Sequence, residues 1–311
     1  MRRRAAIRKL LIAGAVSLFI VPLAAAPAND EPDFVIHSDV RLVLLDVSVK
    51  DRDGGLIGGL SKDNFRVDEN GARQNLTVFA NSDVPVTVGI LVDNSRSMWP
   101  RRSEVLSAAV TFIENSNPQD EMFVLNFNET VKRGLPEGVL FSDNIKQLRG
   151  ALWRGRPEGR TALYDAVIDG LQQLEQGKRD KKTLIVISDG GDTISRHTRH
   201  EMLNMVERTL ATIYTIGLFN PGDRDQDPAL LKRLAKMTGG QAYFPQSAEG
   251  MTEVCEGIAK DIRTRYTVGY PPPAAGGVLR HVHVHVFAPG RTGLIARTRP
   301  SYLYEDAAQS Q

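Results

Sequence analysis

Apolar residues follow two different periods along the chain, and the change of period divides it into segments. Between residues 85 and 263, short apolar runs alternate with stretches in which apolar residues recur every three or four positions. The runs are typical of buried strands, and the stretches are typical of amphipathic helices. The run "TLIVIS" at residues 183–188 has the continuous apolar character of a central parallel strand. Regular alternation of the two kinds of element predicts an α/β fold with a doubly wound, mostly parallel open sheet.

The elements of this α/β segment can be located by their periods and by their capping residues. The expected strands occupy residues 86–92, 122–127, 183–188, 211–218 and 241–244. The expected helices occupy residues 103–115, 198–209 and 248–263, and three more begin near Ser142, Thr161 and Pro228. Ser142 is the expected N-cap of its helix, and Asp227 is the expected cap before a proline at the first helical position.

The flanking residues 33–82 and 265–304 alternate apolar and polar residues with a period of two, which is typical of strands. In "LLDVSVKD", Leu45, Val47 and Val49 share one face, and the Asn-Gly pair of "DENGAR" predicts a tight hairpin turn. In "HVHVHV", valines and histidines lie on opposite faces. Neither flank holds enough apolar residues for an independent core. We therefore expect both flanks to form one small β domain, with the valines in its core and the histidines facing solvent.

The first residues have the organisation of a targeting segment. In residues 1–26, a basic cluster precedes an apolar run that ends in small alanines, which predicts a secretory signal peptide. The alternative is an uncleaved membrane anchor, because the run approaches the length that spans a bilayer. We therefore expect an exported bacterial protein, periplasmic or extracellular, and membrane-anchored if the segment is retained. Residues 305–311 are expected to form a disordered tail.

Charge, cysteine content and missing motifs exclude several kinds of partner and binding site. Five of the 39 basic residues and none of the 37 acidic residues lie in residues 1–26, so the net charge of +2 becomes −3 without them. A mildly acidic chain with no basic stripe argues against nucleic acid as a partner. The single cysteine, Cys255, excludes a disulfide framework and a cysteine zinc site. The sequence holds no phosphate-binding loop or nucleophile-elbow motif, and no small-molecule cofactor is expected.

Oxygen-bearing side chains follow three of the expected strands and loops. Asp93, Ser95 and Ser97 leave the first strand of the sheet, Thr161 precedes a helix, and Asp189 directly follows the central strand. Ligands of open parallel sheets lie beyond the carboxyl ends of the strands, so we expect these five residues to converge. Carboxylates and hydroxyls are hard ligands, which suit Mg²⁺, Mn²⁺ or Ca²⁺ rather than zinc. Two carboxylates only neutralise such an ion, so an incoming Glu or Asp could occupy an open coordination position as a third negative ligand.

This arrangement resembles the von Willebrand factor type A (VWA) domain and its metal-ion-dependent adhesion site. The family pattern is Asp-x-Ser-x-Ser, followed by a distant Thr and then a distant Asp, and this chain has all three parts in that order. The resemblance covers residues 85–263. The flanking "GLSKDNFRVDENGARQ" and the strand "RYTVGY" resemble bacterial exported proteins that carry a VWA-related domain.

The resemblance implies a divalent-cation-dependent protein-binding module of the adhesion type, and not an enzyme. By the family's pattern, Ser95 and Ser97 bind the ion directly, and Thr161 binds it in some states only. Asp93 and Asp189 act partly through water. The same pattern implies that the partner is a protein presenting an acidic residue.

Position 96 departs from the family's pattern. The family often has glycine between the two serines, whereas this chain has Arg96. A cation near the metal could weaken ion binding, or it could help to hold an acidic ligand, so Arg96 is a candidate ligand-binding residue. Asn94, beside it, occupies a position that varies in the family.

Four other interpretations of the same residues stay open. Asp93 could cap backbone amides in an ordinary loop, or the domain could keep its fold without binding metal. The protein could be a structural envelope protein whose β domain does the docking. It could also be a metal-dependent phosphohydrolase with Asp93 as nucleophile, although no lysine or second acid accompanies Asp93 in the pattern that such enzymes need.

Three further motifs are weaker. His281, His283 and His285 share one strand face, which could hold a transition metal or simply face solvent. The fragments "DRDGG" and "DRDQD" are similar to parts of calcium-binding loops, but neither has the bidentate glutamate such loops need. We interpret both fragments as turns.

Overall fold

The computed structural model describes residues 42–304 apart from 221, 223–224 and 274–277. The predicted signal peptide and the predicted tail therefore lie outside the described residues. No helix in the described part of the chain combines the length and the apolar character needed to cross a membrane.

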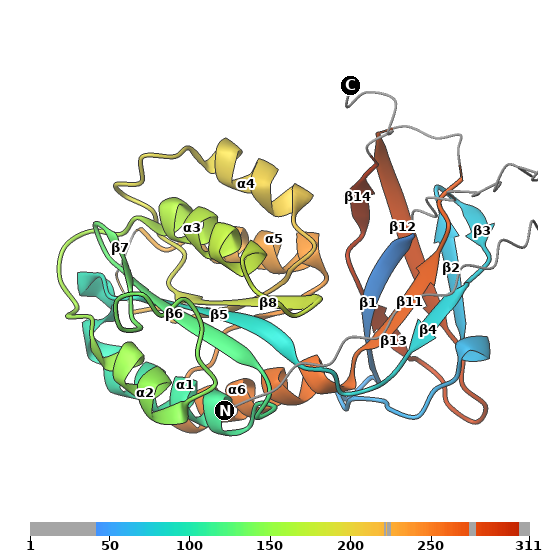
Figure 1. Ribbon diagram of the computed structural model, residues 1–311, viewed down its shortest axis with the longest axis horizontal. Coiled ribbons are helices and arrows are strands. Elements are labelled where there is room, and N and C mark those ends of the chain that lie inside the picture. Colours follow the sequence, from blue (N-terminus) through green and yellow to red (C-terminus); the bar gives the residue numbers. More distant parts are fainter. Residues whose placement is uncertain (1–41, 221, 223–224, 274–277, 305–311) are drawn as a thin grey trace, which may run out of the picture. The chain divides into compact units, whose positions relative to one another are not determined.

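Six strands form the central sheet in the order β10-β9-β8-β5-β6-β7 (Figure 1). Strands from β10 to β6 run parallel to their neighbours, and β7 pairs antiparallel with β6 at one edge. The strands are β5 (Val86–Asp93), β6 (Glu121–Phe127), β7 (Val131–Arg133), β8 (Lys181–Ser188), β9 (Thr212–Gly217) and β10 (Ala242–Tyr243). The predicted mostly parallel α/β sheet is thus confirmed.

Helices cover both faces of this sheet, with α3, α4 and α5 on one side and α1, α2 and α6 on the other (Figure 1). The helices are α1 (Arg102–Glu114), α2 (Ile145–Trp153), α3 (Leu163–Glu175), α4 (Arg199–Arg208), α5 (Pro228–Thr238) and α6 (Ala248–Thr264). Because both faces are covered, every residue of β5 is buried, which explains the continuous apolar runs.

Two helix starts show how far capping signals can be trusted. Asp227 caps α5 as predicted, and its carboxylate accepts a hydrogen bond from the Leu230 N–H at 2.8 Å. The expected cap at Ser142 is wrong. Asn144 is the N-cap of α2, and its side chain accepts from the next helical N–H groups, whereas the Ser142 hydroxyl donates to Gln147 at 2.8 Å. Ser and Asn are both good caps, so two of them two residues apart leave the boundary undecided.

The β domain is built from both flanks of the chain, as its sequence predicts. One sheet has the order β13-β1-β11-β4 and the other has the order β14-β12-β2-β3. Its strands are β1 (Val43–Lys50), β2 (Phe65–Glu69), β3 (Ala72–Gln74), β4 (Val78–Ala80), β11 (Tyr266–Tyr270), β12 (Leu279–Val286), β13 (Ile295–Arg297) and β14 (Ser301–Leu303). Two short 3-10 helices, η1 (Lys62–Asn64) and η2 (Arg96–Arg101), complete the described elements.

Residues from the two flanks share one core in this domain. Leu45 and Val47 of β1 belong to the same buried cluster as Val282 and Val284 of β12. The predicted hairpin joins β2 to β3, and Asn70 and Gly71 have φ angles of 48° and 82°, as a tight turn of this kind requires.

Buried polar contacts connect the last helix of the α/β segment to the first strand of the β domain. Asp261 of α6 is fully buried and accepts hydrogen bonds from Ser48 of β1 and, at 2.7 Å, from the Tyr214 hydroxyl. Burial opposes its ionisation, but Arg265 and these two donors hold the pKa of Asp261 below its ordinary value. Arg265 donates to the Gly239 carbonyl at 2.7 Å. Ser48 is therefore buried, although it lies on the face of β1 opposite to Leu45, Val47 and Val49.

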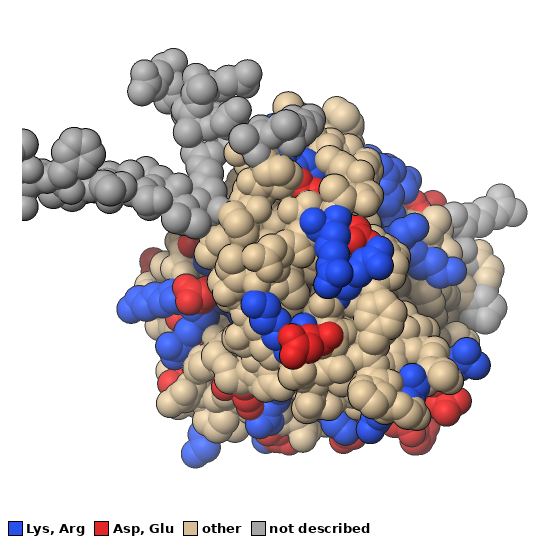
Figure 2. All heavy atoms as spheres, turned by 90° about the vertical axis from the view of Figure 1, so that its right-hand side faces the viewer, with Lys and Arg blue, Asp and Glu red and all other residues tan. Residues whose placement is uncertain are grey.

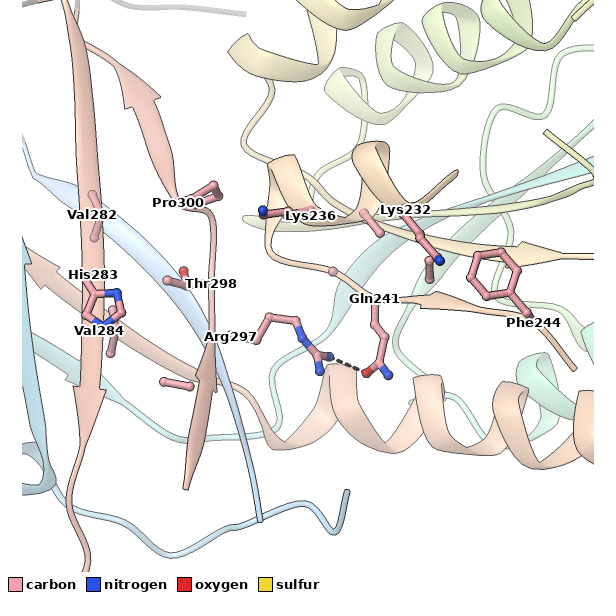
Figure 3. Close-up of a pocket in the computed structure, with 14 residues that line it drawn as sticks. Lys232, Lys236, Gln241, Phe244, Val282, His283, Val284, Arg297, Thr298 and Pro300 are labelled. Atoms are coloured by element: carbon pink, nitrogen blue, oxygen red, sulfur yellow. Dashed lines mark hydrogen bonds between the residues drawn. The ribbon is translucent and has the colours of Figure 1, made fainter. Parts of the chain in front are cut away.

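A second region where the α/β segment contacts the β domain is polar and contains a cavity. A cavity of about 380 Å³ is lined by residues of α5, β10, β12 and β13 (Figure 3). Arg297 points toward Gln241 and donates to its side-chain oxygen, which also accepts from the Lys50 ammonium at 3.0 Å. The face drawn in Figure 2 carries basic and acidic side chains, some of them adjoining, with uncharged surface between the groups, in keeping with the small net charge.

Candidate functional site

The predicted site lies at the carboxyl ends of two neighbouring parallel strands. β5 and β8 pair in register, with Val92 opposite Ile187, so Asp93 at the end of β5 lies near the end of β8. The Ser188 hydroxyl donates to Asp93 Oδ2 at 2.6 Å, and Asp189 follows at once. This juxtaposition requires only that two apolar runs become adjacent parallel strands.

The loop after β5 turns back so that its two hydroxyls meet Asp189. Asp93 Oδ1 accepts a hydrogen bond from the Ser95 N–H at 2.8 Å. The hydroxyl oxygens of Ser95 and Ser97 lie 3.1 Å apart, and the Ser97 hydroxyl donates to Asp189 Oδ2 at 2.6 Å. Ser95 is the N-cap of η2, yet its side chain makes no capping hydrogen bond. Four of the five predicted residues thus form one continuous chain of polar contacts.

Thr161 is joined to the same edge through its backbone. It lies two residues before α3 and is buried. Its N–H donates to the Thr193 hydroxyl at 3.0 Å, and its carbonyl accepts from the Thr193 N–H at 2.8 Å. Thr193 belongs to the loop that follows Asp189, so the two loops are held together. Within the described residues, the Thr161 hydroxyl makes no hydrogen bond, which leaves it available to a ligand.

Asn94 and Arg96 differ in burial and in the contacts of their side chains. Asn94, which the resemblance marked as variable, is buried, and its amide donates to Asn126 at 3.0 Å and accepts from the Arg102 guanidinium. It therefore braces the loop. Arg96 is exposed, and its N–H donates to the Gly159 carbonyl at 3.2 Å.

Sequence reasoning missed three supporting residues. Ser188 holds Asp93, Thr193 holds the Thr161 backbone, and Asn220 donates to the Ser97 carbonyl from the loop after β9. Asn220 follows a buried strand at the same edge of the sheet, so its position was a signal that could have been used.

Electrostatics favours a cation at this edge. Burial, followed by the nearby charge of Asp189, raises the pKa of Asp93 to about 7, although hydrogen bonds from Ser188 and Ser95 oppose the shift. A positive ion between the two carboxylates would remove this penalty. The donor set of carboxylate and hydroxyl oxygens suits a hard divalent ion. The residues present therefore fit Mg²⁺ or Mn²⁺.

The weaker motifs receive little support. Across the described ranges, no group of three or more His, Cys, Asp or Glu residues is placed to hold a metal ion. His281 and His283 are exposed, and His285 lies 3.1 Å from the Asp68 carboxylate, so this strand face is a polar surface. Asp51 accepts from the N–H groups of Asp53 and Gly55, which makes "DRDGG" a turn as predicted. In "DRDQD", residues 223 and 224 lie outside the description.

Comparisons with known proteins agree with this fold. Residues 88–191 match the model of the von Willebrand factor type A domain. A curated relative, an uncharacterized protein of Synechocystis sp., is 25% identical over 171 residues, which are 54% of this chain and 40% of the relative. The chain thus matches less than half of that relative's length.

One solved structure gives the same result at the level of the fold. A von Willebrand factor type A protein from Catenulispora acidiphila is 14% identical with a TM-score of 0.51, covering 85% of this chain and 75% of that one. The conserved hypothetical protein BatB from Bacteroides thetaiotaomicron is 17% identical with a TM-score of 0.45, covering 57% of this chain and 98% of that one.

Proposed function

The chain carries a von Willebrand factor type A domain, and from this premise we propose that it is an exported protein that binds a protein partner through a divalent cation. The cation would be held at the edge formed by Asp93, Ser95, Ser97, Thr161 and Asp189. VWA domains are protein-interaction modules. The metal dependence, the acidic partner and the export of this chain are the parts of the proposal that experiment must test.

The contact between Ser97 and Asp189 carries the proposal. These residues are far apart in the sequence, yet the Ser97 hydroxyl donates to Asp189 Oδ2 at 2.6 Å, with the Ser95 hydroxyl 3.1 Å beyond. A divalent cation bound here would accept the same oxygen lone pairs that these hydrogen bonds use. Ser95, Ser97 and Thr161 would supply hydroxyl oxygens, and the two aspartates would supply charge, directly or through water.

The partner would complete the coordination. Two carboxylates balance a divalent charge, so an acidic side chain of a partner protein can enter an open position as a further negative ligand. Arg96 is exposed next to Ser95 and Ser97 and would contact that side chain. In the polar, exposed rim of the site, such a contact would contribute about 1 kcal/mol or less.

The environment of Asp93 favours binding over the phosphohydrolase alternative. Its side chain is 2% exposed, and both carboxylate oxygens accept hydrogen bonds, from Ser95 and from Ser188. A nucleophilic carboxylate must reach its substrate with a free oxygen. The remaining alternative, a structural envelope protein that does not use metal, differs from our proposal in one measurable property, which is the cation dependence of partner capture.

Capture of envelope proteins by the immobilised chain should depend on the cation. We expect specific partners to be retained in millimolar Mg²⁺ and released by EDTA, because the ion bridges the two proteins. Ser97→Ala should lose this retention, since it removes one hydroxyl of the cluster. Ser107→Ala, an exposed serine on α1, is the matched control and should behave as the unmodified protein. Retention that is equal in Mg²⁺ and EDTA would favour the structural alternative.

A further inference from the structure

Two segments lie side by side next to the cation edge. One comprises residues 96–102, which include η2, and the other comprises residues 153–160, which are the last residue of α2 and the loop that follows it. The Arg96 N–H donates to the Gly159 carbonyl at 3.2 Å, and the Glu158 N–H donates to the Asn94 carbonyl at 2.9 Å. The two segments therefore form one continuous surface, which ends at Thr161.

The two tryptophans of the chain lie on these segments with their side chains exposed. Trp99 is 65% exposed and Trp153 is 60% exposed. Arg102 ties their backbones together, because its N–H donates to the Trp99 carbonyl and its guanidinium donates to the Trp153 carbonyl at 3.5 Å. Exposing two indoles costs the folded protein hydrophobic stabilisation, so their placement beside one site requires an explanation other than packing.

Exposed arginines share the two segments with the indoles, and the exposed Glu158 lies among them, with Glu129 accepting a hydrogen bond from the Arg160 N–H at 3.2 Å. Arg96, Arg156 and Arg160 are exposed, and their guanidinium groups make no hydrogen bond or ion pair with any residue in the described part of the chain. Nearby arginines are engaged elsewhere, since Arg101 pairs with Glu104 at 2.7 Å and Arg154 donates to the Leu135 carbonyl. The surface thus combines aromatic area with three guanidinium groups that are free to contact a ligand.

We propose that this surface, the Trp–Arg rim of Arg96, Trp99, Trp153, Arg156 and Arg160, selects the partner by binding an acidic protein segment that carries an aromatic side chain. The proposal rests on the proposed function, because one acid of the segment would reach the cation while its neighbours meet the rim. Tryptophan and arginine dominate the binding energy of protein interfaces. Three positive charges complement flanking acids, and the indoles offer faces for an aromatic ring.

Tryptophan fluorescence reports this surface alone, since the chain has no other indole. The probe is a synthetic peptide, Asp-Glu-Phe-Asp-Glu repeated twice, titrated in millimolar Mn²⁺. We expect a saturable fluorescence change in the unmodified protein. The double variant Arg156→Glu/Arg160→Glu should bind about tenfold more weakly or worse, since it reverses two charges of the rim. Arg233→Glu, an exposed arginine of α5, is the control and should bind normally.

Additional measurements test the Trp–Arg rim and the cation site independently of each other. A peptide with Phe replaced by Ser should bind more weakly, and Trp99→Ala should lose affinity while keeping Mn²⁺ binding by calorimetry. If the unmodified chain binds Mn²⁺ but not the acidic peptide, the rim proposal is overturned and the cation site stands. If the peptide binds through the rim without any Mn²⁺ binding, the rim stands and the cation site falls. Tighter binding of a twelve-nucleotide oligothymidylate than of the peptide would assign the surface to nucleic acid and overturn the proposal.

Discussion

Replacing Asp93 by asparagine is expected to make the metal-free protein more stable at pH 8 and to abolish its response to Mg²⁺. Burial and the charge of Asp189 raise the pKa of Asp93 to about 7 in the folded protein. The unfolded chain loses this proton near the ordinary value of 3.8. Between these two pKa values the folded state binds one proton more than the unfolded state. The free energy of unfolding therefore falls as pH rises, by about 1.4 kcal/mol for each pH unit in this window. Well above pH 7, where both the folded and the unfolded state have released this proton, the stabilisation from protonated Asp93 is fully lost.

Denaturant unfolding in EDTA from pH 4 to pH 8 measures this effect. In Asp93→Asn the decrease in stability should end near pH 6, where the buried Asp120, whose pKa burial raises to about 6, loses its proton, because asparagine does not titrate. Asp143→Asn, at an exposed position, should keep the decrease up to about pH 7. In the unmodified protein, Mg²⁺ at a hundred times its dissociation constant should add about 2.7 kcal/mol of stability, and Asp93→Asn should gain none of it. Identical pH profiles for the unmodified protein and Asp93→Asn would mean that Asp93 ionises normally.

Removing Arg280 is expected to destabilise the β domain by about 3–5 kcal/mol. Arg280 is fully buried, and its guanidinium donates to Glu69 Oε1 at 2.9 Å and stacks 3.7 Å above the Tyr304 ring. The other Glu69 oxygen accepts from the hydroxyls of Tyr270 and Tyr302, each at 2.7 Å. Arg280→Ala would leave the Glu69 carboxylate buried without its counter-charge and would open a cavity beside it.

Equilibrium unfolding of Arg280→Ala and two further variants tests this ion pair. Arg291→Ala, at an exposed position of the same domain, should change stability by less than about 0.5 kcal/mol. The double variant Glu69→Leu/Arg280→Leu should recover much of the loss, because it removes the buried charge as well as its partner. Since Glu69 belongs to the first flank and Arg280 to the second, a loss no larger than that of the control would contradict a shared core.

The sequence predicted the elements of the fold because their periods reflect burial directly. β5 and β8 read as continuous apolar runs since helices cover both faces of their sheet. Ser48 shows the limit of the same reasoning. It lies on the polar face of β1 and yet contacts Asp261 of α6, because a two-residue period identifies the two faces of a strand and not which other element packs against each face.

The residues of the candidate site were predictable to a different degree. Asp93 and Asp189 follow strands whose ends meet, so the topology alone brings them together. The bracing roles of Asn94 and Asn220 depend on which loops touch, and local patterns do not encode contacts between loops distant in sequence. The exposure of Trp99 and Trp153 was not predicted, because a single apolar residue near a helix end has no periodic pattern that separates a buried side chain from an exposed one.

Diffraction from crystals soaked in millimolar MnCl₂ tests the cation site most directly, because anomalous scattering locates Mn²⁺ without reference to any assumed ligand. Our account predicts one strong peak bonded to the hydroxyl oxygens of Ser95 and Ser97, beside Asp93 and Asp189. The peak should be absent from Asp189→Ala crystals that keep the same fold. Mn²⁺ missing from this edge in the unmodified protein, with the Ser97 hydroxyl still hydrogen-bonded to Asp189, would contradict the proposal of a cation-dependent binding site.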